Sequence, residues 1–254
     1  MDAKLFELDT KMEALRGQMA SFPDNIVADY LERLNVSWIF HESAIEGVVL
    51  SYSELKAAID HRIISDVSLI PMYEDVKNLK LASDIIRELL AAKKPAEPTF
   101  DLVRKLYLML TPDGGVGAPF RKENPLHRQY YHEIVQPDKI AARMKKFGEW
   151  LESPDFIELH PLTRAARLQF QLLQIYPWTK NTGRVARLVG NYILLKAGFL
   201  PAVIHSIERQ RYYDSLRHEN DGLLHLLVES MENSIDTSTR FFHEIAGLAT
   251  RRAS

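Results

Sequence analysis

Apolar residues recur at steps of three and four along most of the chain, whereas runs that alternate apolar and polar residues are few. Such spacing places the apolar side chains on one face of a helix. The two clearest stripes are Leu162, Ala166, Phe170 and Leu173, and Val185, Leu188, Val189 and Tyr192. We therefore predict an all-α fold. Other helices are expected near residues 25–60, 71–92, 208–232 and 236–250.

Glycine and proline mark the expected breaks. Gly198, with Pro201 just beyond it, is expected to end the second stripe, and "KKPAEPTF" (93–100) separates two helical regions. Residues 111–139 form one long irregular region in which "HRQYYHEIV" could form a short hairpin or flap. Loops of this length in compact domains are usually functional or disordered. The aromatic and β-branched residues here favour an ordered, functional loop.

The amino-acid composition excludes several classes of function. The chain has 254 residues, of which 46% are hydrophobic, enough for a substantial core. The net charge of −2 gives no basic field for nucleic acid. The lack of cysteine excludes disulfides, thiolate metal sites and cysteine catalysis. No apolar signal core or membrane-length run is visible. We expect a soluble, cytoplasmic protein that binds neither nucleic acid nor membranes.

The stretch "IYPWTKNTGRVARL" (175–188) has the pattern of a loop that leads into a helix. If that helix begins near Arg184, its first N–H groups have no partners within the helix and favour an anion. Gly183 lets the backbone approach a ligand closely. Arg184 and Arg187 oppose the helix dipole and need a compensating anion, either a carboxylate or a phosphate. A plain helix cap with two solvated arginines is the alternative.

Residues 160–187 resemble the core of the Fic (Fido) family, whose motif is His-Pro-Phe-any-Asp/Glu-Gly-Asn-Gly-Arg-any-any-Arg. The matching positions are Pro177, Trp178, Gly183, Arg184 and Arg187. The segments "LPAVIHSIERQRYYDSLRHEN" and "FRKENPLHRQYYHEIVQPDKIAARMKKFGEWL" resemble the helix after the motif and the flap with its following helix. The similarity spans about residues 35–235.

The resemblance implies an all-α, Fic-like helical bundle with a small β-hairpin flap. Residues 1–95 would form an N-terminal helical segment and residues 96–254 the Fic-like core. "SAIEGVVLSYSEL" resembles the family's inhibitory helix, which would lie at about 37–60. Glu46 would then bind Arg187 and block the seat of the γ-phosphate. A structural ion pair is the other interpretation of these two residues.

The family transfers AMP from ATP to a hydroxyl group on a target protein. By resemblance, the nucleotide would contact Asn181, Thr182, Gly183, Arg184, Arg187, Tyr212 and Tyr213. The target would dock on the flap as an added strand, at Leu126, His127, Arg128, Tyr130 and Tyr131. The family often self-associates, so a homo-oligomer is possible.

Several positions depart from the family pattern. Tyr176 replaces the catalytic histidine, Lys180 replaces the metal-binding acidic residue, and Glu42 replaces the Ser/Thr that begins the inhibitory motif. A tyrosine, with a pKa near 10, is a poor base unless Lys180 and the helix N-terminus lower that pKa. Otherwise Tyr176 donates a hydrogen bond or packs. Lys180 either neutralises phosphate or is a solvated surface residue.

These departures leave two functions open. The first is a non-catalytic or strongly divergent nucleotide-binding regulator. The second is an active protein adenylyltransferase, or another transferase to a protein hydroxyl, that uses Tyr176 and Lys180 and is autoinhibited by Glu46. ATP or another nucleotide is a possible ligand in both, whereas the loss of the acidic residue argues against magnesium. The histidines form no metal-site spacing, and His160 is expected to cap a helix.

Overall fold

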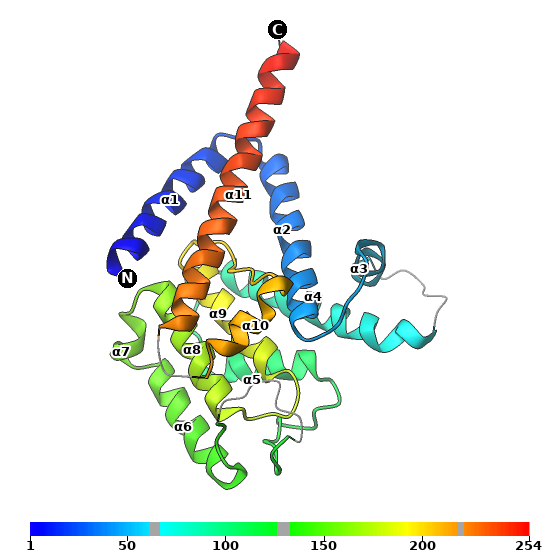
Figure 1. Ribbon diagram of the computed structural model, residues 1–254, viewed down its shortest axis with the longest axis vertical. Helices are drawn as coiled ribbons and strands as arrows, with labels where there is room; N and C mark the ends of the chain where they lie inside the picture. The colour runs from blue at the N-terminus through cyan, green and yellow to red at the C-terminus, as the bar shows by residue number, and fades with distance from the viewer. Residues whose placement is uncertain (61–66, 126–132, 218–220, 254) are drawn as a thin grey trace.

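The computed structural model describes residues 1–60, 67–125, 133–217 and 221–253. All regular elements in these ranges are helices, which confirms the all-α prediction (Figure 1). The α-helices are α1 (Asp2–Ala20), α2 (Asp24–Ile45), α3 (Tyr52–Ile59), α4 (Ile70–Leu90), α5 (Phe100–Leu110), α6 (Ile140–Leu151), α7 (Pro154–Ile157), α8 (Pro161–Ile175), α9 (Thr182–Lys196), α10 (Arg209–Asp214) and α11 (Gly222–Ala253). Short 3-10 turns are η1 (Val67–Leu69), η2 (Pro137–Lys139) and η3 (Ser206–Glu208).

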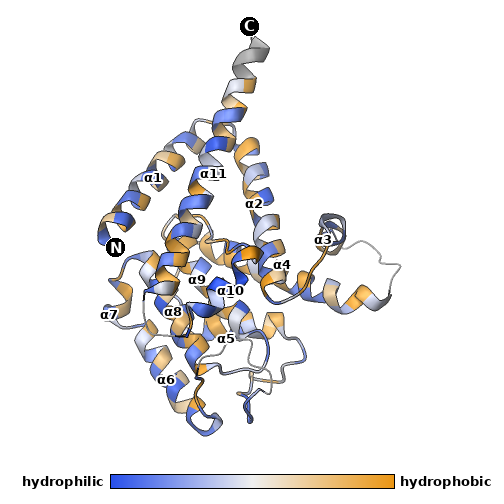
Figure 2. Cartoon of the chain, viewed as in Figure 1, coloured by the Kyte–Doolittle hydropathy of each residue, from blue (hydrophilic) through white to orange (hydrophobic). Residues whose placement is uncertain are grey.

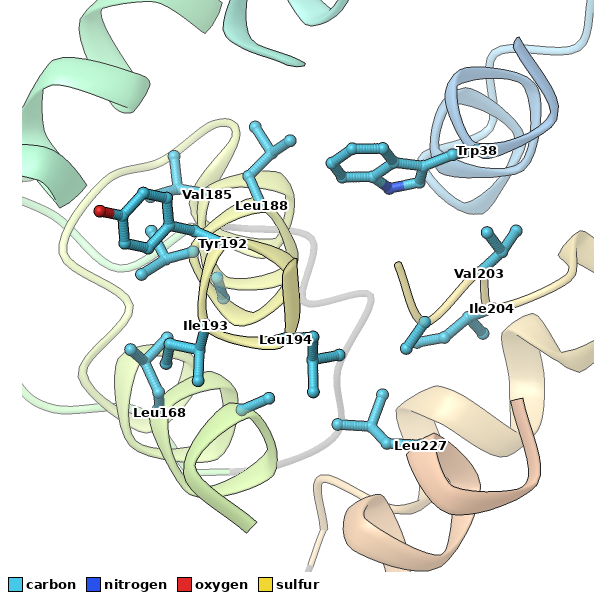
Figure 3. Close-up of a cluster of buried hydrophobic side chains, with 14 of the residues drawn as sticks. Trp38, Leu168, Val185, Leu188, Tyr192, Ile193, Leu194, Val203, Ile204 and Leu227 are labelled. Carbon is cyan, nitrogen blue, oxygen red and sulfur yellow. The ribbon is translucent and has the colours of Figure 1, made fainter. Parts of the chain in front are cut away.

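Helix α9 lies at the centre of the fold. Every residue from Thr182 to Leu194 is buried, so this helix is enclosed on all sides. Figure 3 shows Leu168 of α8, Trp38 of α2, Ile204 after α9 and Leu227 of α11 arranged around it. The two motif arginines at its start therefore sit inside the core, where each needs a partner for its charge.

Helices α8 and α9 approach each other closely at Gly190. A Cβ atom there would lie 2.7 Å from Nε2 of Gln169, so any larger residue would require the Gln169 side chain to shift. Both predicted stripes face the core, except that Phe170 is only partly buried. The core face of α8 is rotated slightly, and Ala165, Leu168 and Leu172 lie on it instead. As predicted, the chain turns at Gly198, where φ is +83°.

The single helix predicted over residues 25–60 is two helices. Helix α2 ends at Ile45, and Gly47 follows with φ of +91°, a backbone conformation that suits glycine. Ser51 then begins α3 with a capping box: its hydroxyl accepts from the Glu54 N–H, and the Glu54 carboxylate accepts from the Ser51 N–H. The expected inhibitory-like helix at 37–60 is therefore the end of α2, a turn and α3.

In the C-terminal region, the helices predicted over 208–232 and 236–250 are instead a short helix and one long helix. The short α10 stands alone, and α11 continues without a break through residues 232–236, which hold no glycine or proline. Helix α1 packs along α11, and Lys4 and Lys11 of α1 both bind Glu232 of α11. Hydrophobic and hydrophilic residues alternate around the turns of both helices, and the end of α11 projects beyond the bundle (Figures 1 and 2).

The described residues contain no strand, so the predicted β-hairpin is not seen there. Its middle, residues 126–132, lies outside the described ranges, as do the five predicted docking residues Leu126, His127, Arg128, Tyr130 and Tyr131. Among the helices described, none has both the length and the apolar character needed to cross a membrane.

Candidate functional site

The loop between α8 and α9 has a fixed backbone. Tyr176 and Asn181 both adopt the left-handed conformation, with φ of 48° and 60°. Tyr176 closes α8, because its N–H donates to the Leu172 carbonyl at 2.8 Å. The amide of Asn181 donates to the Leu110 carbonyl and to Oγ1 of Thr111, at 2.9 and 2.8 Å. Asn181 thus ties the loop to the end of α5 and does not cap α9 with its side chain.

Thr182 uses its hydroxyl within the loop. The hydroxyl donates to the Trp178 carbonyl at 2.8 Å and accepts from the Trp178 N–H at 3.3 Å, and the residue has no exposed surface. The Trp178 ring stacks on Tyr107, with centroids 4.1 Å apart. The expected phosphate contact of the Thr182 hydroxyl does not fit this arrangement, because the hydroxyl already donates to and accepts from the Trp178 backbone.

Arg184 is buried and pairs with a carboxylate from another helix. Its Nη1 atom donates to Oδ1 of Asp75, which belongs to α4, and lies 3.4 Å from Oδ1 of Asn181. Burial opposes the charge, but the hydrogen bond and the charge of Asp75 outweigh it and raise the pKa of Arg184. Nε of Arg184 and Oδ2 of Asp75 are buried without a hydrogen-bond partner among the described residues. The solvated-arginine alternative is therefore wrong for Arg184.

Arg187 binds two carboxylates, one from Glu42 of α2 and one from Glu46, the residue that follows the last residue of α2. Its Nε donates to Oε1 of Glu42 at 2.7 Å, and its Nη2 donates to Oε1 of Glu46 at 2.5 Å. The predicted pairing of Glu46 with Arg187 is thus present. The guanidinium also lies over the Tyr212 ring, 5.2 Å from its centroid. Three carboxyl groups, from Glu42, Glu46 and Asp75, therefore face the two motif arginines.

Glu42 binds Arg187, a contact that was not predicted from the sequence. Its side chain is 4% exposed, against 18% for Glu46. Burial raises the pKa of Glu42, the Arg187 charge lowers it, and Glu46 raises it further, with a net shift upward. The replacement of a Ser/Thr by glutamate was the signal in the sequence. Its partner, 145 residues away, was not visible there.

Tyr176 is half-buried, and its hydroxyl is held neutral. Burial, followed by the charge of Glu46 and the neighbouring Tyr213, raises its pKa to about 12, against the opposing effect of Arg121 and Arg187. The sequence had suggested that Lys180 could lower this pKa, but Lys180 is exposed. The structure therefore favours Tyr176 as a neutral side chain packed against the core and Lys180 as a solvated residue.

Tyr212 and Tyr213 hold the end of α2. The Tyr213 hydroxyl donates to the Ile45 carbonyl at 3.0 Å, and Nε of Arg209 donates to the same carbonyl at 2.7 Å. Tyr212 has no exposed surface, and its hydroxyl donates to Gln169 at 3.4 Å. Burial raises the pKa of Tyr212. The expected contact of these two tyrosines with a nucleotide does not fit their burial in this conformation.

Arg121 organises the base of the long loop and was not predicted. Its Nε donates to the Tyr176 carbonyl and its Nη1 to Oδ1 of Asn124, both at 2.7 Å, and its Nη2 donates to the Val135 carbonyl. Its backbone N–H donates to the Pro177 carbonyl at 2.9 Å. One side chain thus joins both flanks of residues 126–132 to the motif loop. A lone arginine in a Gly- and Pro-rich region carries no periodic signal.

The metal implied by the family resemblance does not fit the residues present. Between Tyr176 and Arg184 the loop holds no carboxylate, and the nearby Asp75 already binds Arg184. Hard cations such as magnesium need oxygen ligands, commonly carboxylates. In the described ranges, no group of three or more His, Asp or Glu side chains is arranged to hold a metal ion. His160 caps α8 as expected, because its Nδ1 accepts from the Leu162 N–H at 3.2 Å.

Comparison of the sequence and of the fold with known proteins finds similar proteins that are named as Fic proteins. Residues 97–194 match the sequence profile of the Fic/DOC family. The protein adenylyltransferase Fic of Aedes aegypti is 28% identical over 249 residues, covering 93% of this chain and 48% of the relative. Fic-1 (residues 134–508) of C. elegans superposes with a TM-score of 0.77 at 20% identity, covering 94% of this chain and 71% of that structure. A Fic-domain signalling protein of Bacteroides thetaiotaomicron gives 0.75 at 20% identity, covering 93% and 98%.

The all-helical fold is that of the solved Fic-domain proteins. The chain matches the Fic/DOC family over residues 97–194. It spans about half the length of the curated relatives that it matches.

Proposed function

We propose that this chain is a Fic-domain regulator with a closed nucleotide-phosphate cradle that does not carry out standard AMP transfer. The cradle consists of the N-terminal turn of α9 with Arg184 and Arg187. The observation that carries the proposal is the state of Tyr176: the residue at the position of the family base has a pKa raised to about 12. A phenol in that state holds its proton at neutral pH and cannot accept one from a target hydroxyl.

Nucleotide binding is supported by the arginine pair. Two buried guanidinium groups at a helix N-terminus suit the oxygens of a polyphosphate. ATP is the probe of choice, because the curated relatives are named protein adenylyltransferases. Since the residues do not fit magnesium, the phosphates would be held by arginine and backbone N–H groups. Protein partners would dock near residues 126–131, and residues 1–95 would act as the inhibitory segment of the 96–254 core.

The alternative is an active protein adenylyltransferase with altered chemistry at Tyr176 and Lys180. The names of the relatives favour it, whereas the exposure of Lys180 and the neutral Tyr176 argue against it. In that case the Tyr176 hydroxyl would act as a hydrogen-bond donor, and Glu46 would hold the enzyme inactive through Arg187.

One experiment separates the two functions. Wild type, Glu46→Gly, Glu46→Gly/Glu42→Gln and Glu46→Gly/Tyr176→Phe are incubated with α-labelled ATP and a cell extract, and ATP binding is measured in parallel by calorimetry. The regulator predicts that ATP binds once both glutamates that hold Arg187 are replaced, with no labelled protein in any sample. Labelling by Glu46→Gly that disappears in the Tyr176→Phe variant would establish the transferase. If Glu46→Gly/Glu42→Gln also fails to bind ATP, the phosphate cradle itself is refuted.

A further inference from the structure

We infer that Glu42 is a second, independent latch on Arg187, so that removal of Glu46 alone leaves the phosphate cradle closed. The inference rests on the proposed phosphate cradle and adds to it the residue that controls access. It concerns a position at which the family resemblance implies a Ser or Thr, whose hydroxyl cannot neutralise a guanidinium.

Glu42 makes the larger set of contacts with Arg187. Oε1 of Glu42 lies 2.7 Å from Nε and 2.5 Å from Nη2, whereas Glu46 reaches only Nη2. The Glu42 side chain is also the more buried of the two. A close ion pair is less screened by solvent when it is buried. Glu42 therefore competes with an incoming phosphate at least as strongly as Glu46 does.

The position of Glu42 does not depend on Glu46. The carbonyl of Ile45, at the end of α2, accepts hydrogen bonds from Tyr213 and Arg209 of α10. His41 adds a further contact, because its Nδ1 accepts from the Ser206 N–H at 3.2 Å. These bonds would remain if the Glu46 side chain were removed. Helix α2 would stay in place, and Arg187 would keep a carboxylate partner.

The third guanidinium nitrogen of Arg187, Nη1, gives a phosphate no other route to this side chain. Its Nη1 atom is buried and has no hydrogen-bond partner among the described residues. The Tyr212 ring covers the guanidinium. A phosphate can reach Arg187 only by displacing both carboxylates, so either carboxylate that remains keeps the guanidinium occupied.

The test compares ATP binding by calorimetry, with and without magnesium, in wild type, Glu46→Gly, Glu42→Gln and the double variant. We expect Glu46→Gly to bind less than about threefold more tightly than wild type. The double variant is expected to bind at least about tenfold more tightly than Glu46→Gly, a difference of ~1.4 kcal/mol. Arg187→Ala in the double background should abolish the gain. Glu32→Gln, an exposed position on α2, is the matched control.

Two outcomes are distinguishable. If Glu46→Gly alone binds as tightly as the double variant, Glu42 is no latch, and the phosphate cradle stands. If no variant binds ATP, the phosphate cradle fails, and the latch is then judged without ligand from the Arg187 Nε–H signal in ¹⁵N-labelled protein, assigned by its loss in Arg187→Lys. Protection from solvent exchange should persist in Glu46→Gly and be lost in Glu42→Ala, which removes the acceptor of the Nε–H. Loss of protection in Glu46→Gly would overturn the inference.

Discussion

The Nε–H of Arg121 donates to the backbone carbonyl of Tyr176 at 2.7 Å. Through this bond, the residue that replaces the family base is held by the same guanidinium that binds Asn124 and Val135. The left-handed backbone of Tyr176 and the two flanks of the long loop therefore depend on one side chain.

Arg121→Ala should destabilise the protein by about 3 kcal/mol, because several partly buried carbonyl and amide oxygens lose a charged donor at once. Urea denaturation monitored by circular dichroism measures the effect. Lys122→Ala, at the exposed neighbouring position, should change stability by less than ~0.5 kcal/mol. Equal midpoints for the two variants would show that Arg121 does not hold the loop.

The raised pKa of Tyr176 predicts in which direction the stability of the protein changes with pH. The folded protein holds this phenolic proton more tightly than the unfolded chain does, so the associated stability is present below pH 10 and is lost as the pH rises from 10 to about 12. Absorbance at 295 nm, wild type minus Tyr176→Phe, should therefore show no tyrosinate from this residue at pH 9–10. A difference signal with a midpoint at or below pH 10 would restore Tyr176 as a candidate base.

Thr182→Val tests the bond that closes the motif loop. Because the buried hydroxyl both donates to and accepts from the Trp178 backbone, the substitution should cost about 1–2 kcal/mol. Thermal unfolding provides the measurement. Thr182→Ser should retain most of the stability, and Thr179→Val, at an exposed position, should be near neutral. A neutral Thr182→Val would mean that the loop is fixed by other contacts.

The pH dependence of stability tests the environment of Glu42. Its folded-state pKa lies above the usual value of 4.5, so the folded state binds this proton more tightly than the unfolded state. The contribution of Glu42 to stability is then greatest below pH 4.5 and falls as the pH rises through the folded-state pKa. The free energy of unfolding of wild type minus that of Glu42→Gln should decrease from pH 4 to pH 7. An increase over this range would contradict the assigned direction.

Local sequence patterns predicted the features that depend on neighbours in the chain. The helix expected to begin near Arg184, which starts at Thr182 in the structure, its end near Gly198 and the cap at His160 all follow from spacing and residue type. The break after Ile45 was missed, because apolar spacing continues across Gly47. Arg121, Asp75 and Glu42 could not be assigned for a different reason: their partners are supplied by other elements of the fold, and a single sequence does not show which distant side chains meet.

Glu42 lies in the last turn of α2 and Glu46 directly follows the helix, and this spacing sets how the cradle responds to substitution and to movement of α2. Substitutions act on one carboxylate at a time, so each meets a backup and the closed state is tolerant of mutation. A displacement of α2 as a rigid body would withdraw both carboxylates together. The two glutamates thus back each other up when one of them is mutated. A signal that moves α2 would remove both of them from Arg187 at once.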